Sequence, residues 1–349
     1  MSKPRPNTVR LSDRGERWAV EKIQKLLGDR GIGDDCAYTS WGPDYLLSTT
    51  DAITITTHLP WPSPRAWGWH VAAVNLSDIA SKGGAPIGLL LSLLIPKDTE
   101  ARVVMDIMRG AKECCARFGT KVLGGDTKQG SEICLVGTAL GRVPKKEFMP
   151  RSGARPGDVI ALTGELGSAA ADFIAIRMLK ALGGRQGADA PGKAAAAKAL
   201  VKRISGRLLR PIPRIPEGRA AARTHLVHAS TDLSDGFSAS IHQLCRPSGV
   251  GADIIWDELP ICKGLLRHGN ASEGWVLHFG GEYELMLTFP IDAMEKVRRA
   301  VERTGTKLTI VGRVVKGNRV TLVRGRQHEP LRYGGWEHFV DVARRDRKE

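Results

Sequence analysis

Stretches with helical periodicity alternate with short apolar runs along most of the chain. Apolar positions repeating every three to four residues predict helices at 12–27, 64–82, 99–118, 193–204 and 235–246, and an alanine-rich helix ending near Leu182. Apolar runs of strand length occur at 45–50, 87–95, 121–123, 133–143, 159–163, 227–231, 251–256, 285–289 and 308–315, and we expect the last two to complete the sheet. This alternation predicts a mixed α/β protein.

The alternation is interrupted once, between Pro144 and Asp158, where Pro, Gly and charged residues gather. Such composition is typical of a domain boundary. A length of 349 residues is also compatible with two domains. We therefore predict an N-terminal domain over 1–147 and a C-terminal α/β domain over 148–349. We expect residues 183–192 to form a loop.

The overall charge points to an anionic ligand. Lys and Arg number 52 and Asp and Glu 37, a net charge of +15, which suits a nucleotide, a phosphate ester or nucleic acid. The sequence argues against a nucleic-acid partner, because it contains neither a known binding motif nor a dense stripe of basic and aromatic residues. No apolar run approaches the roughly 20 residues of a membrane span, and the polar start does not resemble a signal peptide, so we expect a cytoplasmic protein.

The cysteines do not indicate a metal or disulfide framework. All six are scattered without a CxxC pair, and we interpret them as reduced thiols. Motifs for covalent or zinc-dependent hydrolysis, GxSxG and HExxH, are also absent from the sequence.

Acidic residues beside small residues recur at the predicted strand ends. The five motifs are Gly33-Asp34-Asp35, Thr49-Thr50-Asp51, Asn75-Leu76-Ser77-Asp78, Gly124-Gly125-Asp126 and Asp232-Leu233-Ser234-Asp235-Gly236. Each one alone is typical of a helix cap or a turn, but together they favour a Mg²⁺ site that bridges to substrate phosphates. Asp34 and Asp35 should point to opposite faces of an extended segment, whereas Asp232 and Asp235, three residues apart at a predicted helix start, can share a face.

Two glycine-rich segments could bind phosphate. Thr163–Ser168 runs from a predicted strand into a predicted helix, where backbone N–H groups favour an anion, although glycine at such a turn can also serve packing alone. Residues 187–194 nearly spell a P-loop, but they lack its Ser or Thr and follow a helix, so we interpret them as a surface loop.

Taken in order, the motifs resemble the thiamine-monophosphate kinase family over residues 15 to 339. The resemblance rests on Gly31–Ala37, Ser48–Asp51 with His58, Val74–Ala80 with Gly83–Pro86, Gly124–Thr127, Arg151–Ala154, Thr163–Ser168, Asp232–Gly236 and Gly280–Glu284. It implies the two-domain fold of the aminoimidazole ribonucleotide synthetase superfamily and a homodimer formed through the N-terminal domains. The activity it implies is direct in-line phosphoryl transfer from ATP to thiamine monophosphate, assisted by several Mg²⁺ ions, with thiamine diphosphate as product.

The resemblance also implies roles for individual residues. Mg²⁺ would be held by Asp35, Thr49, Thr50, Asp51, Asp78, Asp126, Asp232 and Asp235. ATP would contact Gly125, Asp126, Arg151 and Ser234, and thiamine monophosphate would contact His58, Glu282 and Trp336. Asp78, Asp126 and Asp235 would be the catalytic carboxylates.

One motif departs from the family pattern. Gly280-Gly-Glu-Tyr-Glu284 is one acidic residue short, so either Glu282 keeps its usual role or the local register is shifted. Within the superfamily, a selenophosphate synthetase would carry a reactive Cys in a glycine-rich N-terminal segment, and a hydrogenase-maturation protein would end in Cys. Neither feature is present in this sequence, which argues against these rivals.

Overall fold

Two mixed β-sheets organise the chain in the computed structural model, which describes residues 9–28, 32–55, 63–183, 206–267 and 273–339. The first sheet has the order β1-β2-β5-β3-β4, and only its β3–β4 pair is parallel. Its strands are β1 (Ala37–Trp41), β2 (Asp44–Thr54), β3 (Ala85–Ile95), β4 (Val122–Gln129) and β5 (Cys134–Pro144).

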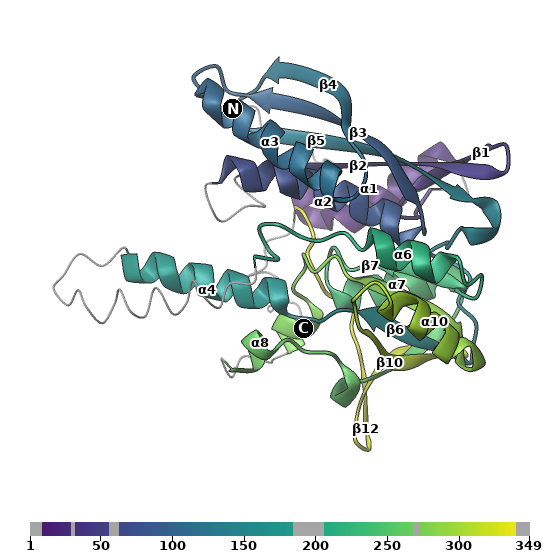
Figure 1. Cartoon of the computed structure of the whole chain (residues 1–349). Coiled ribbons are helices and arrows are strands. Elements are labelled where there is room, and N and C mark those ends of the chain that lie inside the picture. Colours follow the sequence, from purple (N-terminus) through teal and green to yellow (C-terminus); the bar gives the residue numbers. More distant parts are fainter. Residues whose placement is uncertain (1–8, 29–31, 56–62, 184–205, 268–272, 340–349) are drawn as a thin grey trace.

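The second sheet has seven strands in the order β12-β11-β8-β10-β6-β9-β7, with only β11 and β8 parallel. Its strands are β6 (Asp158–Thr163), β7 (Ala229–Asp232), β8 (Gly251–Ile255), β9 (Leu285–Pro290), β10 (Leu308–Val315), β11 (Val320–Arg324) and β12 (Gln327–Pro330). Figure 1 shows the first sheet in the upper half of the molecule and the second in the lower half.

Helices cover one face of the first sheet and surround the second. They are α1 (Leu11–Leu27), α2 (Pro64–Ser81), α3 (Ala101–Arg117), α4 (Ser168–Gly183), α6 (Ile215–Ala222), α7 (Phe237–Ser248), α8 (Lys263–Arg267), α9 (Glu273–Leu277) and α10 (Met294–Glu302). Short 3₁₀ turns occupy Lys145–Glu147, Trp256–Glu258 and Ile291–Ala293. Within the part of the chain that is described, no helix combines the length and apolarity that a membrane crossing requires.

Helix α2 is the central element, because it packs against β2 and β5 of the first sheet and against α6 and β7 of the second unit. Its start is set by Ser63, whose hydroxyl accepts the Ala66 N–H at 3.4 Å, and by Pro64 in the first turn. Most of its residues are buried on every side, as in a helix with protein all around it. One apolar core cluster accordingly runs from α2 and the first sheet to Leu285, Leu287 and Phe289 of β9.

On the other face of the first sheet, none of the described helices packs. Apolar side chains on this open face are partly exposed: Ile87 at 42%, Leu90 at 40% and Leu94 at 37% on β3, and Leu123 at 44% on β4. The open face is therefore suited to contact with another apolar surface.

The predicted mixed α/β class is confirmed, but several elements differ from expectation. Strand β10 does not complete the second sheet, because β11 and β12 follow it. The predicted strand 121–123 continues to Gln129, and the sequence analysis gave no β1, α6 or α10. The polar residues of β1 and β4 resemble loop residues because these strands lie at the sheet edges and are largely exposed. The expected loop at 183–192, beyond Gly183, and the expected helix at 193–204 lie outside the described residues.

Candidate active site

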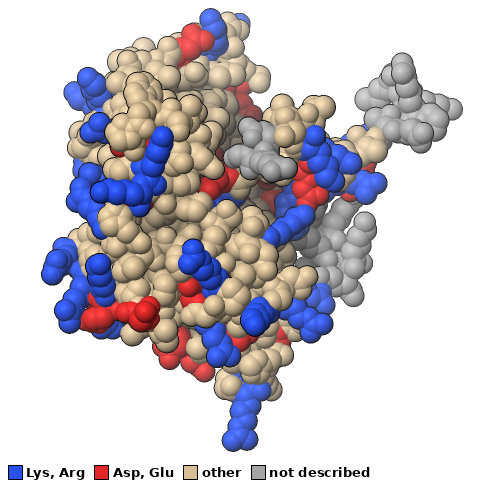
Figure 2. Space-filling view, turned by 90° about the vertical axis from the view of Figure 1, so that its right-hand side faces the viewer, with Lys and Arg blue, Asp and Glu red and all other residues tan. Residues whose placement is uncertain are grey.

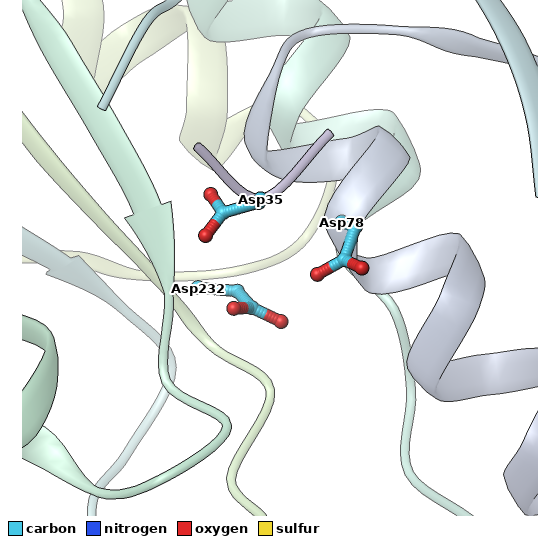
Figure 3. A group of neighbouring side chains, drawn as sticks. All are labelled: Asp35, Asp78 and Asp232. Carbon is cyan, nitrogen blue, oxygen red and sulfur yellow. The ribbon is translucent and has the colours of Figure 1, made fainter. Parts of the chain in front are cut away.

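Three carboxylates from distant parts of the chain converge where the two sheets meet. Asp35 precedes β1, Asp78 lies in the last turns of α2, and Asp232 is the last residue of β7. One oxygen of each carboxylate lies within 4.8 Å of the others, and Figure 3 shows the three side chains turned toward a common space. We call these three residues the acidic cluster.

Hydroxyl groups hold the acidic cluster in place. Ser77 donates to Asp232 at 2.5 Å, and Thr49 of β2 donates to Asp78 at 2.5 Å. Thr231 likewise donates to Asp35 at 3.0 Å, so each carboxylate is oriented by a neighbouring segment before any ligand is present.

Two carboxyl groups of the cluster have raised pKa values, because the protein does not fully compensate the negative charge gathered there. Burial, followed by the charge of Asp35, raises the pKa of Asp232 to about 7. Burial and the charge of Asp51 raise the pKa of Asp78 well above its ordinary value. Burial would also raise the pKa of Asp35, but Arg151 and Lys82 hold it well below its usual range. Crowded carboxylates of this kind favour a bound divalent cation.

Lys82 and Arg151 bind the loop that carries Asp34 and Asp35. The fully buried Lys82 ammonium lies 2.5 Å from Asp34 Oδ1 and 2.8 Å from Asp35 Oδ2. Arg151 donates its backbone N–H to Asp34 Oδ2 at 2.8 Å and pairs through its guanidinium with Asp35. The expectation that Asp34 and Asp35 lie on an extended segment is wrong, because residues 32–36 form turns and bends. Both carboxylates therefore reach Lys82, although only Asp35 joins the acidic cluster.

The structure divides the other predicted metal ligands between two faces of the first sheet. Along β2, Thr49 and Asp51 face α2, and burial raises the pKa of Asp51. Successive strand residues point to opposite faces, so Thr50 faces the open side, where its hydroxyl binds the Gly137 carbonyl at 2.8 Å. Asp126 pairs with Ser92 on β3, and Ser92 pairs with Val136 on β5. Because paired residues share a face of the sheet, Asp126 also lies on the open face.

Asp126 is therefore separate from the acidic cluster within one chain. Its side chain is 57% exposed and forms an ion pair with Lys128 at 3.7 Å. The neighbouring Gly125 on β4 is paired through β3 and β5 with Asp51 on β2. Gly125 and Asp51 are therefore three strand spacings apart, or about 14 Å. The acidic motifs at 49–51 and 124–126 lie inside β2 and β4, not at strand ends as expected. A Cβ at Gly125 would lie 1.9 Å from the Leu91 carbonyl oxygen, so glycine is required there for strand pairing.

The residues expected around the ligands lie at the end of β7 and near the C-terminus. Asp235 lies between β7 and α7, and burial together with the charge of Glu16 raises its pKa to about 6. Ser234 beside it is half-buried. Trp336 donates its backbone N–H to the Asp235 carbonyl at 3.0 Å and leaves its ring about half exposed. His58 lies outside the described residues.

Glu282 is buried and caps helix α4. Its carboxylate accepts the Gly167 N–H at 2.8 Å and the Ala169 N–H at 3.1 Å. Burial raises the pKa of Glu282 to about 8. The prediction that the backbone N–H groups at Thr163–Ser168 bind a phosphate is wrong for these N–H groups at the start of α4, because they bind the carboxyl group of Glu282. In the shortened motif, Tyr283 adopts a left-handed φ of 53°.

Sequence reasoning missed Lys82 as part of this site, and it gave Asp34 and Ser77 no role of their own although both lie in the acidic motifs. A lysine at a helix end, as in Ser81-Lys82-Gly83, usually indicates a solvated cap. Its full burial depends on β7 from the other unit, which the local sequence does not reveal. The adjacent acidic pair was visible in the sequence and could have pointed to a buried cation.

Basic side chains are dispersed over the face of the molecule that Figure 2 draws. Figure 2 shows Lys and Arg in separate groups on the face it draws, with uncharged residues between them. Although Lys and Arg (52) outnumber Asp and Glu (37), the basic side chains form no continuous stripe on this face.

Comparison with known proteins identifies the family of the chain. Residues 33–143 match the N-terminal domain of the AIR synthase related proteins, and residues 155–325 match the C-terminal domain. The thiamine-monophosphate kinase of Pyrococcus abyssi is 31% identical over 323 residues, which cover 92% of this chain and 94% of that protein. The chain belongs to the thiamine-monophosphate kinase family.

Further relatives of this kinase family agree with the assignment. The thiamine-monophosphate kinase of Aquifex aeolicus is 30% identical over 95% of this chain and all of its own length. The solved structure of AaThiL complexed with AMPPCP and TMP has a TM-score of 0.78 and 28% identity, and it covers 95% of this chain and 99% of that one. The family resemblance and the two-domain AIR synthase related fold expected from the sequence are thereby confirmed.

Proposed function

We propose that the protein transfers the terminal phosphoryl group of ATP to thiamine monophosphate, giving thiamine diphosphate and ADP. The observation that carries this proposal is the acidic cluster, in which three carboxylates from both structural units meet within 4.8 Å. The similarity to family members extends over more than nine-tenths of the chain, and one similar structure is complexed with AMPPCP and TMP.

The residues of the cluster fit Mg²⁺. Their oxygen atoms are the ligands that Mg²⁺ prefers, and the raised pKa of Asp232, about 7, reflects negative charge that a divalent cation would neutralise. Asp35, Asp78 and Asp232 would hold the metal, with Thr49 and Asp51 next to them, and Asp235 would bind on the ligand side. When bound, Mg²⁺ would neutralise phosphate charge and align the reacting oxygens.

Arg151 would bind the phosphates of ATP. Its guanidinium already pairs with Asp35, and its Nε–H is buried without an acceptor among the described residues. A buried donor without a partner is costly, and a phosphate oxygen would satisfy it. Ser234 and Gly125 are the other proposed ATP contacts.

The chemistry requires no strong general base from the chain. The attacking oxygen belongs to a phosphate group that is already ionised at neutral pH, so the obstacle is the approach of two polyanions. Arg151, together with Mg²⁺ held by the carboxylates, would balance this charge, while His58, Glu282 and Trp336 would contact thiamine monophosphate.

We further propose that the protein is a homodimer joined through the open face of the first sheet. Leu90, Leu94 and Leu123 are partly exposed there, which is unfavourable in a monomer. Asp126 and Thr50 lie on the same face. In such a dimer, Asp126 would serve the acidic cluster of the partner subunit, because it lies too far from the cluster of its own chain.

A coupled assay of ADP release tests the proposed reaction. With Mg²⁺ and ATP, thiamine monophosphate should give turnover, whereas free thiamine and aminoimidazole precursors should not. Excess chelator should abolish the activity. Turnover with an aminoimidazole precursor and none with thiamine monophosphate would assign the protein to another reaction of the superfamily.

A further inference from the structure

Lys82 is a fully buried cation beside the acidic cluster. It follows the last residue of α2, and its side chain is 0% exposed. Its ammonium group lies 2.5 Å from Asp34 Oδ1, 2.8 Å from Asp35 Oδ2 and 2.9 Å from the Ser230 carbonyl oxygen. Three N–H donors thus meet three acceptors, so the ammonium group is fully hydrogen-bonded.

The position of Lys82 resembles that of a metal ion. It bridges two carboxylates of neighbouring residues, and Asp35 is also a member of the acidic cluster. The opposite oxygen of Asp35 accepts the Thr231 hydroxyl at 3.0 Å and pairs with Arg151. Asp35 is therefore held on both oxygens by the protein, whereas Asp78 and Asp232 accept hydrogen bonds from the hydroxyl groups of Thr49 and Ser77.

A buried carboxylate pair without a cation would be strongly destabilising. Mg²⁺ bound at the cluster could compensate this charge, but only when it is present. A lysine on the chain compensates it permanently and cannot dissociate. Its place at the C-terminal end of α2 adds a favourable interaction with the helix dipole.

We propose that Lys82 is a positioning residue that takes the place of one metal ion: together with Arg151 it neutralises Asp34 and Asp35, and it orients Asp35 before Mg²⁺ binds. This inference rests on the proposal that the acidic cluster binds Mg²⁺. Lys82 itself would contact neither substrate. Its effect would be to keep the metal-free site folded in the geometry that Mg²⁺ requires.

Thermal unfolding with Mg²⁺ and with chelator tests this role. Lys82→Met should lower the Tm of the metal-free protein by about 5 °C or more, because it leaves two buried carboxylates with less compensation. Mg²⁺ should restore part of this loss, so the rise in Tm on adding Mg²⁺ should be larger than in the wild type. Lys82→Arg, which keeps the charge, should show a rise close to that of the wild type.

Asp34→Asn provides a second background for the removal of Lys82, because it leaves only the Asp35 carboxylate and so reduces the repulsion between the two carboxylates. In this background too, Lys82→Met should increase the Mg²⁺-induced rise in Tm, so the test remains decisive where the single variant does not fold. Arg214→Met is the matched control, since Arg214 is another buried cation, paired with Glu284 away from the cluster. It should lower Tm equally with and without Mg²⁺.

The outcomes separate the two proposals. An equal loss of Tm with Mg²⁺ and with chelator, in both backgrounds, would overturn the role of Lys82. A wild-type protein whose Tm does not respond to Mg²⁺ at all would instead contradict the metal site on which the role rests.

Discussion

Individual hydroxyl groups connect the segments that form the acidic cluster. Ser77 is next to Asp78 in the chain but donates to Asp232, and Thr231 is next to Asp232 but donates to Asp35. Each short polar side chain therefore links its own segment to a carboxylate of another. This crossed pattern places three carboxylates from distant parts of the sequence in one small space.

Asp78→Asn is expected to remove most of the activity and to leave the fold intact. Turnover should fall by at least ~100-fold, the scale of a lost charge-stabilising contact at a reacting phosphate. The metal-free variant should be as stable as the wild type or more stable, because burial and Asp51 already raise the pKa of Asp78. Steady-state kinetics and thermal unfolding measure both effects. The exposed Asp98→Asn is the control, and near-normal turnover of Asp78→Asn would refute the assignment.

Glu282 should make stability depend on pH above neutrality. Its pKa of about 8 in the folded protein exceeds the ordinary value of about 4.3 in the unfolded chain, so the native state keeps a proton that the unfolded state loses. Stability should therefore fall as the pH rises from about 4.3 to 8. Glu282→Gln cannot titrate, and its Tm should fall less than that of the wild type between pH 6 and pH 8.5.

The exposed Glu295→Gln serves as the control for this pH series, because arginine pairing keeps the pKa of Glu295 below its ordinary value. It should follow the wild-type slope between pH 6 and pH 8.5. Identical slopes in the wild type and Glu282→Gln would mean that Glu282 is ionised in the folded protein throughout this range.

The sequence motifs named carboxylates that the structure brings together, but they did not give the arrangement of the whole set. Asp35, Asp78 and Asp232 were all expected near a metal, and the structure brings them together. Thr50 and Asp126 were expected with them, yet they lie on the opposite face of the sheet. Which face a strand residue occupies depends on the pairing register, and that register is set by contacts far along the chain.

At the scale of elements, helix α2, which carries Asp78, crosses α3 at very short range. A Cβ at Gly68 would lie 1.8 Å from the Ile107 carbonyl oxygen, and a Cβ at Gly110 would lie 1.8 Å from the Arg65 carbonyl oxygen. The two helix backbones are therefore in contact at this point. Periodicity predicted both helices, but it could not predict how closely they approach.

Gly110→Ala is expected to destabilise the protein. The added methyl group would meet backbone atoms, which cannot move without separating the helices, and such overpacking costs about 2 kcal/mol or more. The gain in helix propensity, about 1 kcal/mol, is smaller. Thermal or urea unfolding measures the loss. Gly124→Ala is the control, because its Cβ would meet no atom closer than 3.9 Å, and an equal effect of both changes would argue against the close crossing.

At the scale of the whole molecule, the open face of the first sheet predicts association. Light scattering at micromolar concentration should give about twice the chain mass of 37.8 kDa. Leu94→Asp, which places a charge on the partly exposed apolar face, should shift this mass toward that of a monomer. A wild-type monomer at this concentration would contradict the proposed dimer.

Subunit mixing tests whether Asp126 acts across the dimer. Asp78→Asn and Asp126→Asn should each be nearly inactive alone. In a mixed dimer, one site would carry both substitutions and the other would be intact, so co-expression should restore up to about a quarter of wild-type activity. Mixed dimers as inactive as the two parents would show that Asp126 acts on its own chain.

The burial of α2 on all sides also bears on local opening of the protein. Amide hydrogens exchange with solvent most slowly in elements that open only when the whole domain unfolds. Helix α2 lies between both sheets and shares one core with β9, so the amides from Asn75 to Ser81 should be among the last to exchange. The C-terminal end of α2, which carries Asp78 and precedes Lys82, would then stay ordered while edge strands such as β4 and β12 open and close locally.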